Sequence, residues 1–101
     1  MKFKVKNKKG ENIANFMRRA GYHFAGQSQD KNQLAFTHSL GSGSYPRFHI
    51  YLNQNKETGE VFINLHLDQK KPVYKGARAH NAEYEGEIIE KEARRIKELL
   101  I

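Results

Sequence analysis

Two stretches decide the fold of this chain: Arg47–Leu52, with the sequence RFHIYL, and Val61–Asp68, with the sequence VFINLHLD. Both alternate apolar and polar residues, which is the period of a strand with one face buried. The segment Lys56–Gly59 between them is typical of a four-residue turn in which the glycine supplies a positive φ angle. The two stretches are therefore predicted to form an antiparallel hairpin.

The turn determines which residues of the predicted hairpin lie opposite each other. Counting outward from it places apolar side chains on one face, in the pairs Leu52/Ile63, Ile50/Leu65 and Phe48/Leu67. The other face carries the polar pairs Tyr51/Asn64, His49/His66 and Arg47/Asp68. A slip of one residue would place apolar residues opposite polar ones, so the turn and the alternation support the same register. The two histidines are then direct cross-strand neighbours.

Two amphipathic helices flank the predicted strands. The first is expected over residues 12–20, with Asn12 as its N-cap and Gly21 just past its end. The second is expected over residues 87–100, where an apolar stripe is formed by Ile89, Ala93, Ile96 and Leu100. Because each stripe must be buried, both helices are expected to cover the apolar face of the sheet.

The remaining segments complete the predicted architecture. Further strands are expected over residues 22–29 and 33–40, and the basic residues 1–10 are expected to be either an edge strand or a mobile arm. Residues 69–86 are predicted to form a long loop. The chain is therefore expected to be a single domain over residues 1–101. Its predicted class is an α+β two-layer sandwich, in which an antiparallel meander of three to four strands carries an N-terminal and a C-terminal helix on one face.

The charge of the chain points to a polyanionic partner. Its 101 residues include 18 Lys and Arg against 11 Asp and Glu, a formal net charge of +7. Such a potential attracts nucleic acids and accelerates their encounter with a protein, although it also serves simply to keep a small protein soluble. The chain has no cysteine, which excludes disulfides, thiolate metal sites and cysteine nucleophiles.

Neither a secretory signal nor a membrane span is visible in the sequence. No apolar run follows the basic N-terminus, and no segment approaches the roughly 18 apolar residues that a membrane span needs. We therefore expect a cytoplasmic protein with no membrane partner. No cofactor is expected, because the glycine-rich residues 41–44 are not followed by the Lys-Ser/Thr pair of a phosphate-binding loop.

The polar face of the predicted hairpin is the candidate functional surface. This face and the segment after it supply the residues expected to contact nucleic acid, which are Arg47, Tyr51, Phe62, Asn64, Asp68, Lys70, Lys71, Lys75 and Arg78. Cationic side chains contact phosphates, and aromatic rings on a sheet face stack on the bases of single-stranded RNA. The first functional hypothesis is therefore a nucleic-acid-binding module, with RNA preferred. The alternatives are cross-strand packing for the rings and a solvated loop for the basic cluster.

The two paired histidines allow further interpretations. As a general base and a general acid, His49 and His66 would be the catalytic residues of a ribonuclease or small hydrolase, which is the second hypothesis. Together with Asp68, and completed by His80 or Glu83, they would form a zinc site. They are also compatible with a solvated sheet face that has no chemical role, which the pair of histidines alone favours.

Phe62 supports a third hypothesis. A phenylalanine on an exposed sheet face needs an explanation. Burial of that face in a homodimer, or against another protein, would supply one, and the chain would then be a protein–protein interaction module.

Two further features resemble the HicA-type toxins of toxin–antitoxin modules, within the double-stranded-RNA-binding-domain-like fold group. One is the helix end Met17–Tyr22, MRRAGY, which is similar to an Ala-Gly-aromatic element of those toxins, and the other is the histidine-bearing strand after Gly41-Ser42. Those toxins are small basic messenger-RNA ribonucleases built from a helix, three strands and a helix, and a Gly-Ser-His segment supplies their catalytic histidine. The resemblance implies a ribonuclease in which His49, several residues further along and inside the strand, is the nearest candidate for that histidine.

Overall fold

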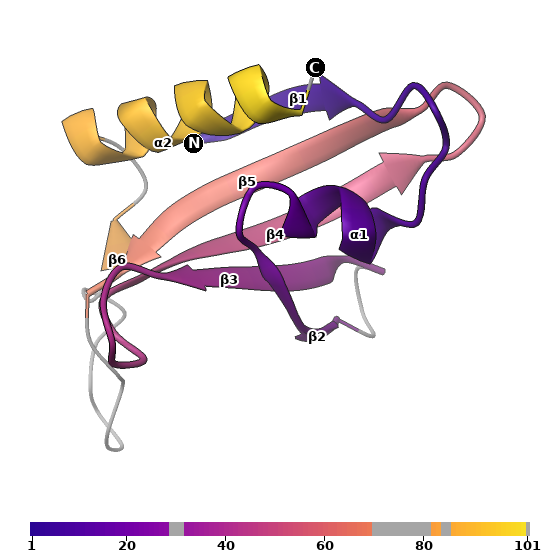
Figure 1. The fold of residues 1–101 in the computed structure, drawn as a ribbon. Helices are drawn as coiled ribbons and strands as arrows, with labels where there is room; N and C mark the ends of the chain where they lie inside the picture. The colour runs from indigo at the N-terminus through magenta and orange to yellow at the C-terminus, as the bar shows by residue number, and fades with distance from the viewer. Residues whose placement is uncertain (29–31, 70–81, 84–85, 101) are drawn as a thin grey trace.

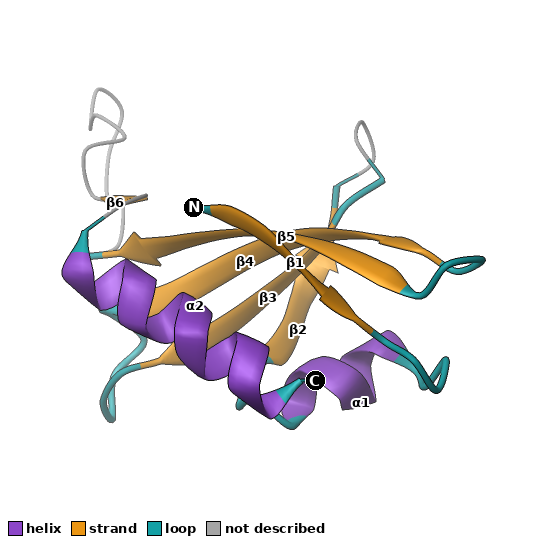
Figure 2. Ribbon diagram, turned by 90° about the horizontal axis from the view of Figure 1, so that it is seen from above, coloured by secondary structure: helices purple, strands orange, loops and turns teal. Residues whose placement is uncertain are grey.

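A computed structural model describes residues 1–28, 32–69, 82–83 and 86–100, with only the backbone described at 82–83. Its elements in chain order are β1 (Lys2–Lys6), α1 (Ile13–Arg18), β2 (His23–Gln27), β3 (Leu34–Ser39), β4 (Arg47–Asn55), β5 (Glu60–Asp68), β6 (Ala82–Glu83) and α2 (Glu87–Leu99) (Figure 1). They form one antiparallel sheet with both helices on the same side of it (Figure 2). The predicted α+β class is confirmed.

The sheet is larger than the predicted meander of three to four strands. Its strand order is β1-β5-β4-β3-β2, and β6 pairs with the end of β5. Strands β2 to β5 form a meander, but residues 2–6 add a further edge strand beside β5 rather than forming a mobile arm. Of residues 69–86, predicted to be a long loop, residues 82–83 form β6, whereas residues 70–81 and 84–85 lie outside the described part of the chain.

The hairpin of β4 and β5 has the predicted register, with every predicted apolar and polar pair observed. Gly59 in its turn has a φ of +80°, and a Cβ added there would lie 2.8 Å from the backbone oxygen of Asn7. The turn therefore requires glycine for both its conformation and its close approach to a neighbouring segment. The Gly59 N–H closes the turn by donating to the carbonyl of Asn55 at 2.8 Å.

The two helices begin and end for local chemical reasons. Helix α1 is shorter than the predicted 12–20, but its Asn12 side chain accepts hydrogen bonds from two N–H groups of the first turn, as predicted. Just past its end, Gly21 adopts a φ of +89°, the conformation expected of a helix C-terminal glycine. Helix α2 ends one residue before the predicted boundary. Neither of these helices, the two in the described ranges, is long and apolar enough to cross a membrane.

The core lies between the helices and the apolar face of the sheet. From the helical side it receives Phe16, Met17, Ala20, Tyr22, Ile89, Ala93, Ile96 and Leu100. From the sheet it receives Val5, Phe36, Phe48, Ile50, Leu52, Val61, Ile63, Leu65 and Leu67. Every residue of the predicted hairpin's apolar face is in this set, so the opposite face of the sheet is the one left for function.

A buried polar network ties α2 to the segment after α1. The Tyr22 hydroxyl donates to the Glu92 carboxylate at 2.6 Å, and Arg95 donates to the same carboxylate at 2.6 and 2.7 Å. Arg95 also donates to the backbone oxygen of Ala20 at 2.7 Å. Burial, together with the negative charge of Glu92, raises the pKa of Tyr22 well above its ordinary value, so the hydroxyl keeps its proton and remains a donor.

Candidate nucleic-acid interface

The candidate site lies on the sheet face opposite the helices (Figure 2). Strand β1 contributes to this face because its register places Lys2 opposite Asn64 and Lys4 opposite Phe62. Residues directly opposite each other in a sheet project from the same face. The lysines of β1 therefore lie beside the predicted polar face of the hairpin, and the face spans at least three adjacent strands.

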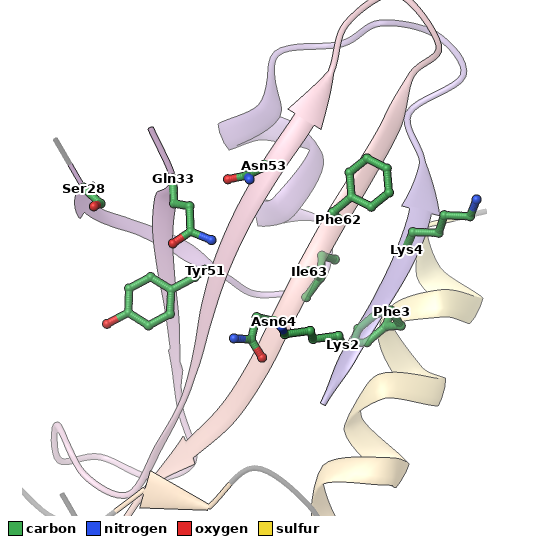
Figure 3. A pocket seen from close by; sticks show the side chains of 10 residues that line it. All are labelled: Lys2, Phe3, Lys4, Ser28, Gln33, Tyr51, Asn53, Phe62, Ile63 and Asn64. Carbon is green, nitrogen blue, oxygen red and sulfur yellow. The ribbon is translucent and has the colours of Figure 1, made fainter. Parts of the chain in front are cut away.

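A shallow pocket of about 810 Å³ occupies the middle of this face (Figure 3). Besides Phe3, Ser28 and Ile63, its lining has two lysines, two further aromatic rings and three side-chain amides, which are Lys2, Lys4, Tyr51, Phe62, Gln33, Asn53 and Asn64. The Phe62 side chain is prominent because the residue is 46% exposed. A pocket with apolar rings, amides and cationic groups can accept a flat, partly polar ligand that carries negative charge.

Along the same face, the hairpin forms a compact group of three residues, here called the His–Asp cluster: His49, His66 and Asp68. The Nδ1 atom of His49 lies 3.1 Å from one carboxylate oxygen of Asp68, and the Nε2 atom of His66 lies 3.2 Å from the other. Arg47 donates its Nε–H to the same carboxylate at 3.3 Å. One carboxylate thus holds two imidazoles and one guanidinium.

Ring stacking connects the cluster to the pocket. The Tyr51 ring lies 4.5 Å from the His49 ring and 5.5 Å from the His66 ring, and the two imidazoles are 4.8 Å apart, measured between centroids. The packing leaves the side chains of His49 and His66 only 13% and 6% exposed. The histidines therefore lie on the predicted face, but their rings are largely closed to solvent.

Burial lowers the pKa of both histidines below the ordinary value, because a desolvated imidazolium is unfavourable. The hydrogen bond and negative charge of Asp68 oppose this at His49, and its charge opposes it at His66. The positive charge of Arg47 adds to the lowering at both rings, and the N-terminal ammonium and His49 add to it at His66. Both imidazoles are therefore expected to be neutral at pH 7.

These shifts predict that the metal-free protein loses stability as the pH falls through the range around 6.5 in which unfolded imidazoles take up protons. In the unfolded chain both imidazoles take up protons near pH 6.5. The folded protein resists that protonation, so the unfolded state binds more protons and the free energy of unfolding decreases until the folded pKa values are also passed. Urea unfolding in the presence of a chelator measures this dependence.

A control variant, His23→Gln, changes an exposed histidine outside the cluster and should keep the pH profile of stability, whereas His49→Gln should flatten that profile. A profile that is flat in the unmodified protein would contradict the prediction.

The structure brings most of the predicted site residues onto one face, which are Arg47, His49, Tyr51, Phe62, Asn64, His66 and Asp68. The carboxylate of Asp68, predicted to contact nucleic acid, is turned toward the two histidines and Arg47. The predicted residues Lys70, Lys71, Lys75, Arg78 and His80 lie outside the described residues, as does the side chain of Glu83.

Sequence reasoning included Asn64 but missed the contribution of β1 and of two further amide side chains, Gln33 and Asn53. The alternation of lysines at 2, 4 and 6 was a signal for an edge strand, but nothing local indicated that β5 would be its partner. Gln33 and Asn53 join the pocket only because β3, β4 and β5 lie side by side.

Comparisons of the chain with protein-family models, curated proteins and solved structures found no match. The resemblance to HicA-type toxins therefore stays a prediction. The observed element order has a strand before the first helix and four strands between that helix and β6, where the resemblance implies three strands between two helices.

Proposed function

We propose that the protein binds single-stranded nucleic acid, with RNA preferred, on the open face of its sheet. The observation that carries this proposal is the pocket in which Tyr51 and Phe62, from adjacent strands, lie beside Lys2 and Lys4 (Figure 3). Unpaired bases stack on such rings whatever their identity, and neighbouring cationic side chains contact the phosphates between them. In a duplex the bases already stack on one another, so their faces do not reach such rings, and the proposal is specific to single strands.

The charges of the pocket rim support the same ligand. Strand β1 presents Lys2, Lys4 and Lys6 along one side of the pocket face. Lys4 pairs with Glu60 at 2.8 Å, but its side chain is 62% exposed, and exposed ion pairs contribute little free energy. A phosphate can therefore replace the carboxylate at small cost, and the chain's net charge of +7 favours the approach of a polyanion.

The amide side chains give the pocket some capacity to distinguish bases. Across the β4–β5 pair Asn64 lies opposite Tyr51 and Asn53 lies opposite Phe62, and Gln33 also lines the pocket (Figure 3). Amides offer both a donor and an acceptor, which matches the edges of unpaired bases. We expect binding to depend mainly on the rings and the lysines, with a modest base preference added by the amides.

The ribonuclease hypothesis has less support from this geometry. General acid–base catalysis needs imidazole nitrogens that reach the substrate. Here one nitrogen of His49 and one of His66 face Asp68, and both rings are largely buried.

The homodimer hypothesis concerns the same face around Phe62, so it predicts competition between self-association and RNA binding. Sedimentation with and without RNA would measure this competition.

The proposal predicts salt-dependent binding of a labelled single-stranded oligonucleotide. For single strands the logarithm of the association constant falls by about 0.7 per phosphate contact for each tenfold rise in salt, so three to four contacts predict a slope of about −2 to −3. Fluorescence anisotropy across a salt series measures this slope. RNA and DNA of one sequence, and a duplex as control, test the preference for RNA and for single strands.

Two results would count against the proposal: absence of binding at the lowest salt, or affinity that does not respond to salt. Gel analysis of the same mixtures would show whether RNA is cleaved, which is the outcome that the ribonuclease hypothesis requires.

A further inference from the structure

The His–Asp cluster has the geometry of a metal-binding site. One imidazole nitrogen from each histidine and one carboxylate oxygen from Asp68 all lie within 4.8 Å of one another. The His49 nitrogen lies 3.1 Å from one oxygen of this carboxylate, and the His66 nitrogen lies 3.2 Å from the other. Ligands at about 2.0 to 2.1 Å from a tetrahedral ion lie about 3.3 Å apart. Small rotations of the two rings and of the carboxylate would therefore bring all three atoms to coordinating positions around one ion.

We propose that His49, His66 and Asp68 bind a divalent transition-metal ion such as Zn²⁺, with its remaining positions open to water. Two imidazoles and one carboxylate suit zinc, cobalt or iron, whereas calcium and magnesium prefer all-oxygen sites. The site is separate from the stacking pocket and does not rest on the proposed RNA binding.

The surroundings of the cluster fit a metal site. Arg47 donates to the Asp68 oxygen that His49 also contacts, and this bond holds the carboxylate with its other oxygen toward His66. Hydrogen bonds of this kind orient metal-binding carboxylates. All three ligands are on β4 and β5, whose paired backbones fix their separation more rigidly than a loop would.

Two features limit the affinity of the site. The guanidinium of Arg47 lies 3.3 Å from the Asp68 carboxylate and repels a cation. An ion bound to the His49 nitrogen that faces Asp68 would also move the imidazole proton to Nε2, which is buried and has no hydrogen-bond partner among the described residues. We therefore expect micromolar rather than nanomolar affinity.

The test uses the full chain without a histidine tag, stripped with a chelator. Calorimetric titration with Zn²⁺ should show one ion per chain, and Co²⁺ should give visible absorption bands from a site with nitrogen and oxygen ligands. Asp68→Asn and His49→Gln should each weaken binding at least tenfold. His23→Gln is the matched control because His23 is an exposed histidine on β2, and its affinity should be unchanged.

Far-UV circular dichroism and the amide NMR spectrum would establish that each variant is folded before titration. Should His49→Gln fail to fold, Asp68→Asn alone carries the test, because it keeps the size of the side chain and removes its charge. Any of three outcomes would overturn the proposal: no saturable binding to the unmodified protein, unchanged binding to Asp68→Asn, or loss of binding in His23→Gln. Repeating the RNA titration with chelator and with Zn²⁺ distinguishes the two proposals. RNA binding in the presence of chelator would support the proposed function alone, and the metal titration then decides the metal site separately.

Discussion

Replacing Tyr51 and Phe62 together by alanine is expected to weaken the binding of single-stranded RNA by about thirtyfold or more. Each base that stacks on an aromatic ring contributes about 1 to 3 kcal/mol, so two rings contribute about 2 kcal/mol at least. A change of about 1.4 kcal/mol in binding free energy corresponds to a tenfold change in affinity. Because both rings line the same pocket, their joint loss should remove most of the stacking surface.

The single variants and a matched control separate the function of the rings from their packing. Tyr51 packs against both histidines, whereas the ring of Phe62 is 46% exposed, so Phe62→Ala is expected to leave the fold intact. Phe24→Ala changes an even more exposed phenylalanine, on β2 outside the pocket lining, and should bind RNA normally. Equal affinity of Phe62→Ala and the unmodified chain would contradict the pocket as the binding site.

Salt series on the same variants would show which residues contact phosphate. Lys2→Ala should reduce the magnitude of the salt slope by about 0.7, because one phosphate contact is lost. Phe62→Ala should weaken binding without changing the slope, because stacking releases no counterions. If the pocket binds RNA as proposed, the lysine variant will change the salt slope, whereas the phenylalanine variant will change the affinity alone.

Glu92→Ala is expected to lower the free energy of unfolding by about 3 kcal/mol, since breaking a buried charge pair costs about 3 to 5 kcal/mol. Glu92 is only 6% exposed, and its removal leaves the fully buried Tyr22 hydroxyl without its acceptor. The estimate is at the lower end because the Arg95 side chain, 38% exposed, can turn toward water. Such a loss is a large part of the stability of an ordinary domain.

Urea unfolding measures this change against two comparison variants. Tyr22→Phe removes the hydroxyl but leaves Glu92 paired with Arg95, so it should cost less, about 1 to 2 kcal/mol. Glu98→Ala changes an exposed glutamate of α2 and should stay within about 0.5 kcal/mol of the unmodified chain. A stability of Glu92→Ala equal to that of Glu98→Ala would show that the network contributes little.

The parts of the fold that were predictable have strong local signals. The β4–β5 register follows from strict alternation on both sides of a turn that requires Gly59, and the start of α1 follows from the capping side chain of Asn12. The pairing of β1 with β5 has no such signal, because residues 2–6 offer only two apolar residues and their partners lie at 60–64. The predicted strand number was too low for this reason.

The sequence predicts which residues of the hairpin share the candidate face, but not how exposed their side chains are. Alternation alone places Tyr51, His49 and His66 on one face. Whether an imidazole on that face is open to solvent depends on how neighbouring rings stack, which is a property of three-dimensional packing. Glu92 was detectable in principle, since it lies on the same face of α2 as Ile89 and Ile96, where a charge requires a partner.

The position of β1 also constrains the order in which the molecule assembles during synthesis. β1 leaves the ribosome before the other strands of this sheet, but its partner β5 ends only at Asp68, so β1 cannot be placed until β5 has been synthesised. The β2–β5 meander, built from neighbouring segments, can form earlier because closing short loops costs less entropy. Until β1 arrives, the edge of β5 is unpaired and open to wrong partners. The first strand of this sheet therefore pairs late, and we expect this delay to lengthen the interval in which the edge of β5 is exposed to aggregation.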